Sequence, residues 1–250
     1  MREFYIGIHE VYDTHRFERA CISINRLRAR RKPIGAVPVL LDSGAFTELA
    51  TFGRYRHEVG DYARAIRRLV RGGIANIAVA VAQDYMCEPF MLAKTGLSLA
   101  EHHRLTIERY DALTDQDLPV PVMPVLQGYH PIDYARHAEA YGDRLVQGAW
   151  VGVGSVCKRN SKPERIIEVL TAIEAARPDL RLHGFGVKLT ALQHAGVRAL
   201  LHSADSLAWS YSARKQGRVG HDWREAARFV EKVEVASSRE AEPWQIPMIL

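Results

Sequence analysis

Short apolar runs recur along the chain, and each of them ends in polar or small residues. Runs of this length are typical of buried strands in a parallel sheet. The first run alternates between apolar and polar positions, and most of the others are nearly continuous. The predicted strands are Phe4–His9, Val37–Leu41, Ile74–Ala82, Val120–Leu126, Ala149–Val153, Leu180–Phe185 and Val197–Leu201.

Amphipathic segments separate these runs and predict helices. The segment Glu58–Arg71 is apolar on one face and ends at a Gly-Gly pair, and Ser98 with Glu101 forms a capping box. The predicted helices are Thr14–Arg31, Glu58–Arg71, Ser98–Leu113, Pro131–Tyr141, Ser161–Arg177, Thr190–Ala195 and His221–Val235.

Strand and helix alternate about seven times with short connections, which predicts an α/β fold with a parallel sheet. Such a sheet forms either a TIM-like (β/α) barrel or an open doubly wound fold. No Gly-x-Gly-x-x-Gly follows the first strand, which favours the barrel. An eighth strand is not evident, so we expect it to be irregular or missing. We expect one catalytic domain over residues 1–235 and an irregular tail over 236–250.

Polar residues or glycines follow the carboxyl ends of the predicted strands. They are His9, Asp42, Asp84, Gln127, Gly152–Ser155, Lys188 and Asp205. Each one alone is explained as a cap or a turn residue. Together they predict one active-site rim, because the carboxyl ends of barrel strands share a face. Three aspartates near one pocket repel, so at least one pKa should be raised, as in retaining glycosidic cleavage by a nucleophile and a general acid/base.

Metal binding and cysteine chemistry are weaker alternatives. A metal site at the aspartates would need further ligands, and His102 and His103 fall in the middle of a helix. Cys21, Cys87 and Cys157 lie far apart with no zinc-ligand spacing, which indicates a reducing compartment. No histidine is obviously paired with Cys157 as a nucleophile. We therefore expect no metal and no cofactor.

The chain is basic, with a net charge of +5, and 27 of its 34 basic residues are arginine. Arginine suits phosphate recognition, although a GC-rich genome would produce the same bias. The predicted nucleic-acid contacts are Arg64, Arg67, Arg68 and Arg71 on one helix face, with Lys158, Arg159 and Arg214. A solvated helix face is the alternative for the first four. No membrane span or signal peptide is evident, so we expect a cytoplasmic protein.

Several motifs resemble those of the tRNA-guanine transglycosylases. The segment Asp42-Ser43-Gly44-Ala45-Phe46 resembles their Asp-Ser-Gly-Gly-Phe motif. The other similar segments, in the same order, are Val125–Gly128, Val151–Ser155, His183–Val187 and Ala204–Ser210. The family's zinc module is absent after Asp205, and Ala45 replaces a glycine. These departures resemble the branch that places 7-deazaguanines into DNA in phages and bacterial modification systems.

The resemblance implies a base exchange through a covalent intermediate. Asp205 would attack C1′ of the nucleoside and Asp42 would act as general acid/base. Asp84 would bind N1 and the 2-amino group of guanine, and Gln127 with backbone amides at Gly152–Gly154 would read O6. The remaining residues of the implied base site are Ser43, Phe46 and Lys188. The target base must leave the stack, and the aromatic residues that could sandwich it are Phe46, Tyr85, Tyr129 and Trp209.

The expected substrates are DNA and a 7-deazaguanine base resembling preQ0 or preQ1. The same exchange on tRNA is the nearest alternative, and a catalytically silent nucleic-acid-binding barrel subunit is another. An unrelated barrel enzyme with a metal-bound sugar substrate is more distant. The sequence leaves open a homodimer or a partner protein. The expected location is the cytoplasm of a bacterial host or of a phage-infected cell.

Overall fold

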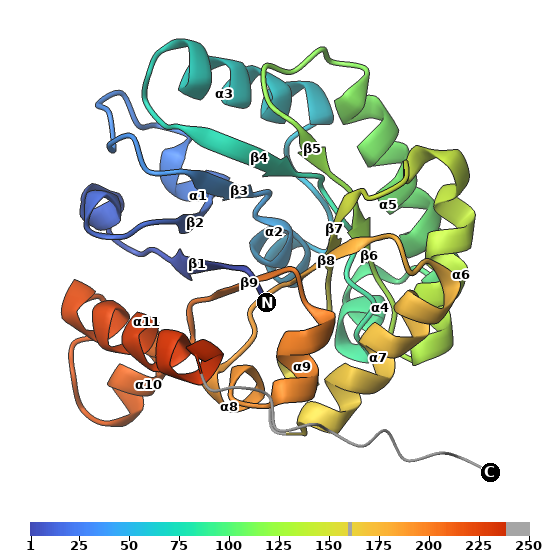
Figure 1. Cartoon of the computed structure of the whole chain (residues 1–250). Helices are drawn as coiled ribbons and strands as arrows, with labels where there is room; N and C mark the ends of the chain where they lie inside the picture. The colour runs from blue at the N-terminus through green and yellow to red at the C-terminus, as the bar shows by residue number, and fades with distance from the viewer. Residues whose placement is uncertain (160–161, 239–250) are drawn as a thin grey trace.

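The computed structural model describes residues 1–159 and 162–238, and these form a TIM-like barrel (Figure 1). The strands of the described part are all parallel and lie in one nearly closed sheet, ordered β5-β4-β3-β2-β1-β9-β8-β7-β6. They are β1 Glu3–Gly7, β2 Ala20–Ser23, β3 Val39–Asp42, β4 Ile77–Val81, β5 Val122–Met123, β6 Val125–Leu126, β7 Trp150–Val153, β8 Arg181–Gly184 and β9 Ser203–Ser206. The barrel predicted from the sequence is confirmed.

The seam of the barrel lies between β5 and β6, which follow each other along the chain. Pro124 separates them and has no N–H to donate to a ladder. The Met123 carbonyl accepts from the Ala82 N–H at 3.0 Å, on the β4 side, and the Pro124 carbonyl accepts from the Gly152 N–H at 2.9 Å, on the β7 side. We therefore regard β5 and β6 as one barrel strand that is interrupted at a proline. Counted in this way, the barrel has the eight strands of a TIM barrel.

The strand that the sequence did not reveal is β2. The prediction of one helix over Thr14–Arg31 is wrong, because this region contains the 3-10 helix η1 (Val11–Arg16), β2 and the short α1 (Ile24–Leu27). Ala20 and Ile22 are fully buried, whereas the alternate residues of β2 are only partly buried. A period-two pattern of four residues is too short to stand out against the helical pattern around it.

The last barrel strand is also displaced from its prediction. Residues 197–201 were expected to be a strand, but Ala195–Leu200 forms helix α9, after α8 (Leu189–Leu192). The strand is β9, whose sequence Ser-Ala-Asp-Ser is mostly polar. Polar side chains are acceptable at Ser203 and Asp205 because these two positions turn into the barrel. As a result, Asp205 lies within a strand and not in the loop after it.

Four outer helices of the described residues agree with the predictions, and three further helices besides α9 were not predicted. The agreeing helices are α3 Val59–Arg71, α5 Leu99–Thr114, α6 Pro131–Tyr141 and α7 Pro163–Ala176. The unpredicted ones are α2 Ala45–Phe52, α4 Pro89–Thr95 and α10 Ala208–Lys215, and the short 3-10 turns are η2 Gly142–Arg144 and η3 Cys157–Arg159. Helix α11 (Trp223–Ser238) continues three residues beyond its predicted end at Val235, and 239–250 lie outside the described residues.

Two apolar layers hold the barrel together. The larger layer lies between the strands and the outer helices, which surround the sheet in Figure 1. The smaller layer fills the barrel interior and consists of Tyr5, Leu40, Val79, Val81, Met123 and Val125. Residues that face each other in register point to the same side of a sheet, so Asp205, level with Tyr5 on β1, also points inward. None of the described helices is long and apolar enough to cross a membrane.

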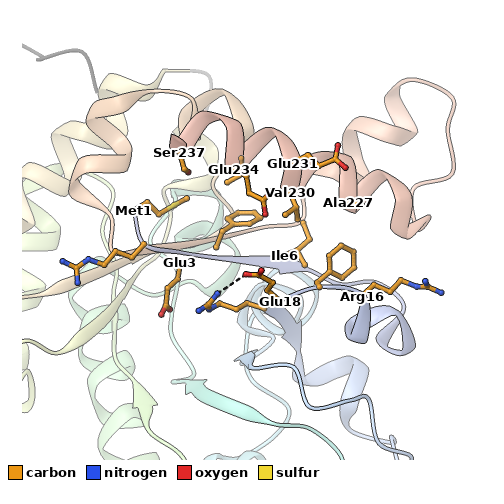
Figure 2. Close-up of a pocket in the computed structure, with 15 residues that line it drawn as sticks. Met1, Glu3, Ile6, Arg16, Glu18, Ala227, Val230, Glu231, Glu234 and Ser237 are labelled. Carbon is orange, nitrogen blue, oxygen red and sulfur yellow. Dashed lines mark ion pairs between the residues drawn. The ribbon is translucent and has the colours of Figure 1, made fainter. Parts of the chain in front are cut away.

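A surface groove of about 410 Å³ lies at the amino ends of the strands, between β1 and α11 (Figure 2). Its walls carry the acidic side chains of Glu3, Glu231 and Glu234 and basic side chains such as Arg16 (Figure 2). Glu18 pairs there with Arg19 at 3.6 Å. The groove is on the face of the barrel opposite to the predicted active-site rim.

The arginine stripe of α3 mainly contacts protein. Arg68 donates to the carbonyl oxygens of Arg30, Leu27 and Arg28 at 2.6, 2.9 and 3.0 Å, and Arg67 donates to the carbonyl oxygen of Gln116. These carbonyls lie in connections that lead into the amino ends of β3 and β5. Arg67 and Arg68 therefore secure the face opposite to the rim, while the stripe's outer members are exposed.

We expect the Arg68→Ala substitution to lower the free energy of unfolding by roughly 1–3 kcal/mol, because it leaves several carbonyls without their charged donor. Arg64→Ala is the matched control on the same helix, since Arg64 is exposed and makes one local ion pair with Asp61. Its loss should stay within about 0.5 kcal/mol. Urea unfolding of both variants measures the difference, and equal losses would contradict a structural role for Arg68.

Candidate active site

A cavity of about 280 Å³ opens at the carboxyl ends of the barrel strands. Asp42, Asp84 and Asp205 line it together with Gln127, and most of the remaining wall is apolar. The groove at the opposite face is larger but its charged groups lie along a surface and do not converge. A concave apolar site with a few convergent polar groups is the usual form of an active site. We therefore take the smaller cavity as the candidate active site.

The structure brings most of the predicted site residues to this cavity. Those lining it are Asp42, Phe46, Asp84, Gln127, Gly154 and Asp205. Ser43, Gly152 and Lys188 are not among the lining residues. Ser43 is buried, and its hydroxyl has no hydrogen-bond partner within residues 1–159 and 162–238. Gly152 lies against the ring of Phe185, and Lys188 is exposed at the start of α8.

Two groups contact the Oδ1 oxygen of the Asp205 carboxylate. Its Oδ1 accepts from the Gly186 N–H at 3.1 Å and contacts Nε2 of His183 at 3.3 Å. The Trp150 indole donates to Ser203 Oγ at 2.8 Å, and Ser203 Oγ contacts Nδ1 of His183 at 2.9 Å. The consistent assignment is that the Ser203 hydroxyl donates to Nδ1, so Nε2 carries the proton and donates to Asp205.

Asp42 is the last residue of β3 and points into the same cavity. Strands β2 and β1 lie between β3 and β9, the strand of Asp205. Its Oδ2 accepts from the Gly44 N–H at 3.0 Å, and Ser23 on β2 also hydrogen-bonds to it. Burial and the nearby charge of Asp205 raise the pKa of Asp42. The turn requires glycine at position 44, because its φ is 78° and a Cβ would lie 2.6 Å from Asn25 Nδ2. A carboxyl with a raised pKa suits proton transfer.

Asp84 follows β4 and is nearly buried, at 7% exposure. Burial raises the pKa of Asp84 to about 7, although the hydrogen bond donated by the Gln127 side chain opposes part of this effect. The charge of Asp42 raises it further. Asp84 therefore changes protonation state near neutral pH.

Gln127 is fixed on both its backbone and its side chain. Its N–H donates to Nδ1 of His137 at 2.9 Å, and its Oε1 accepts from Ser155 Oγ at 2.8 Å. Burial and the neighbouring His103, which stacks on it with ring centroids 4.0 Å apart, lower the pKa of His137 to about 3. A neutral His137 keeps a lone pair for the backbone N–H of Gln127, so the position of Gln127 on the cavity wall is fixed.

Gly152 lies in β7 and Gly154 follows its last residue, and at both positions the lack of a side chain leaves room for a neighbouring residue. The Gly152 and Gly154 N–H groups donate to the carbonyls of Pro124 and Leu126, both at 2.9 Å. These two N–H groups therefore close the barrel in this structure, and the reading of O6 by backbone amides of this segment stays a prediction. A Cβ on Gly154 would lie 2.1 Å from Gln127 Nε2, so glycine there makes room for Gln127.

Of the aromatic residues expected to sandwich a base, Phe46 lines the cavity and is 53% exposed. Tyr85 instead packs among Tyr55 and His102 in a separate cluster. Trp209 is buried and donates to the Gly7 carbonyl at 2.9 Å. Tyr129 is not among the lining residues. The structure adds Phe185 to the cavity wall, from the connection after β8.

Cations lie near the mouth of the cavity. Arg26 lines it and donates to the His9 carbonyl at 2.7 Å. Burial, Arg26 and Arg214 all lower the pKa of His9, which places Arg214 close to this end of β1. Arg159 stacks over Tyr129 at 5.2 Å. Lys158, also predicted to bind nucleic acid, has a side chain outside the part that the structure describes.

Sequence reasoning missed several residues of the site. Cys21, Ser23 and Arg26 were hidden because β2 was taken for part of a helix. Cys21 hydrogen-bonds to Asp205, and burial and the charges of Asp205 and Asp42 raise its pKa. A signal for His183 was present, since a histidine in an apolar strand needs a partner. Among residues 1–159 and 162–238, no group of three or more His, Cys, Asp or Glu side chains could hold a metal ion.

Comparison with protein families shows which family the chain belongs to. The family described as DeoxyPurine in DNA protein A (DpdA) matches residues 1–230. The chain belongs to the DpdA family. DpdA is the DNA guanine transglycosylase of the tRNA-guanine transglycosylase superfamily, so the superfamily resemblance is confirmed. The DpdA match includes every strand of the barrel and all three cavity aspartates. Comparison with curated proteins gave no match.

We expect Gly154→Ala to reduce base exchange at least tenfold, because the new methyl group must displace Gln127. Gly60→Ala on α3 is the matched control, since its Cβ would meet only Arg64 NH1 at an ordinary 3.6 Å. Exchange of labelled guanine measures both variants, with urea unfolding to separate misfolding from a local effect. A fully active Gly154→Ala variant would show that the position of Gln127 is unimportant.

The raised pKa of Asp84 predicts a pH-dependent stability. In the folded protein Asp84 keeps its proton up to about pH 7, whereas the unfolded chain releases it near pH 4, so this contribution is present at low pH and is lost as the pH rises to about 7. From pH 5 to pH 8 the wild type should lose on the order of 2 kcal/mol relative to Asp84→Asn. Urea unfolding at both pH values tests this, with exposed Asp143→Asn as the control. Parallel pH profiles for wild type and Asp84→Asn would contradict it.

Proposed function

We propose that this protein replaces guanine in DNA with a 7-deazaguanine through a covalent aspartyl-glycosyl intermediate. The observation that carries the proposal is the pairing of two unlike carboxyl groups in one cavity. Asp205 has its Oδ1 fixed by the Gly186 N–H and His183, while burial and the charge of Asp205 raise the pKa of Asp42. One group is prepared to attack and the other to carry a proton.

In the first half-reaction, Oδ2 of Asp205 attacks C1′ of the target deoxyguanosine. The C1′–O bond forms as the C1′–N9 bond breaks, and the electron pair of the broken bond goes to the base. Asp42 gives its proton to a nitrogen of the leaving guanine. The contacts to Oδ1 orient the nucleophile, and we therefore assign the attack to Oδ2.

In the second half-reaction, Asp42 takes the N9 proton of the incoming base. N9 then attacks C1′ and the ester bond to Asp205 breaks, which regenerates both carboxyl groups in their starting states. Two successive displacements retain the configuration at C1′. Atoms and protons balance without a cofactor or a water molecule, and the apolar wall of the cavity keeps water from the ester.

Recognition of the base uses the row of polar side chains on the cavity wall. An ionised Asp84 accepts from N1–H and the 2-amino group, because a carboxylate offers only acceptors. Gln127 has a second amide hydrogen beyond the one that it donates to Asp84, and this hydrogen can donate to O6. Ser155 has a left-handed φ of 58°, a strained conformation for serine. We assign its N–H as a second donor to O6.

The target base must leave the DNA stack to reach this cavity. Arg26, Arg159 and Arg214 lie where the phosphates beside a flipped nucleotide would pass, which makes them better candidates for DNA contacts than α3. Membership of the DpdA family favours DNA over tRNA as the polymer. The two placed carboxyl groups favour an enzyme over a silent binding subunit, which needs neither beside phosphate.

The test is exchange of radiolabelled guanine into double-stranded DNA, single-stranded DNA and tRNA in parallel. We expect incorporation into DNA and not into tRNA. Asp205→Asn should lower exchange at least a thousandfold and form no covalent adduct with DNA on denaturing gels, while DNA binding persists. Exposed Asp143→Asn is the control and should keep full activity.

The possible outcomes separate the alternatives. Incorporation into tRNA alone would replace DNA with tRNA as the substrate. Full exchange by Asp205→Asn would overturn the assignment of the nucleophile. Binding of DNA without any exchange by the wild type would favour the silent barrel.

A further inference from the structure

One buried carboxylate of the cavity has no part in the chemistry described above. Glu88 lines the cavity and is 4% exposed. Its Oε2 is buried and has no hydrogen-bond partner among the described residues. Glu88 occupies the N-cap position of α4, yet its side chain makes no capping hydrogen bond. A buried carboxylate oxygen without a donor is costly, which points to a ligand that supplies one.

A chain of hydrogen bonds fixes the place of Glu88 on the cavity wall. Gln127 donates to Asp84, and Ser155 Oγ donates to Gln127 Oε1 at 2.8 Å. The Cys87 N–H donates in turn to Ser155 Oγ at 3.4 Å, and Glu88 is the next residue. The polar row therefore runs from Asp84 through Gln127 and Ser155 to Glu88.

This row matches the order of groups around a guanine ring. The ring edge presents the 2-amino group, N1–H, O6 and then position 7. With Asp84 at the amidine edge and Gln127 at O6, the continuation of the row lies at position 7. This is the position at which a 7-deazaguanine carries its substituent.

We propose that Glu88 binds the C7 substituent of the incoming base and selects one with N–H donors, a protonated aminomethyl group above a cyano group. The inference rests on the proposed base exchange. A carboxylate accepts hydrogen bonds, so it pairs with an ammonium group and opposes the lone pair of a nitrile.

The test compares kcat/KM for 7-aminomethyl-7-deazaguanine and 7-cyano-7-deazaguanine, with guanine self-exchange as the measure of the exchange chemistry alone. The wild type should prefer the aminomethyl base by roughly tenfold or more. Glu88→Gln should reduce or reverse this ratio, because its amide can donate to a nitrile. Glu108→Gln on the exposed side of α5 is the control and should leave the ratio unchanged.

A wild type that prefers the cyano base would overturn the inference without any variant, so the test does not depend on the folding of Glu88→Gln. An unchanged ratio in a folded Glu88→Gln protein would also overturn it. In both cases normal guanine self-exchange would leave the proposed function intact. Absence of self-exchange in the wild type would overturn the proposed function, and this inference with it.

Discussion

Three carboxyl groups share one small and mostly apolar cavity, where burial and mutual repulsion make the ionised forms unfavourable. The surroundings of each group determine how it accommodates this effect. Like charges this close cannot all be ionised cheaply in a region with little water. The three carboxyl groups differ in how their surroundings affect the ionised form. Asp205 receives donors from Gly186 and His183, while burial raises the pKa values of Asp42 and Asp84. Unequal surroundings thus turn similar side chains into groups with different chemistry.

The closed barrel is what brings these groups within reach of one another. Side chains alternate across each strand, so inward positions on neighbouring strands converge above the apolar layer that fills the barrel interior. Convergence also creates crowding, and glycines relieve it. Gly154 leaves space for Gln127, and Gly152 leaves space for the ring of Phe185. The polar groups are then locked by hydrogen bonds to elements behind the cavity wall, such as His137 on α6.

The sequence was informative where a strand is apolar on both faces and uninformative where it is not. Asp42 and Asp84 could be predicted because each follows a continuous apolar run that reads as a buried strand. The strand of Asp205 was predicted in the wrong position, and only motif resemblance singled out Asp205 as the nucleophile, because Ser203 and Asp205 turn polar side chains into the barrel. β2 is short and lies among helix-like residues, which hid Cys21 and its neighbours. Hydrogen-bond partners such as His183 depend on contacts between distant segments, which periodicity does not report.

The exchange breaks one N-glycosidic bond and forms another of the same kind, so bond energies do little to favour the forward over the reverse reaction. Direction and choice of base must then come from differences in binding. Asp84 cannot provide the difference, because guanine and a 7-deazaguanine present the same amidine edge to it. The two bases first differ at position 7, where one has a lone pair and the other a substituted carbon. A residue that discriminates has to lie beyond O6 on the cavity wall, which is where the polar row ends at Glu88.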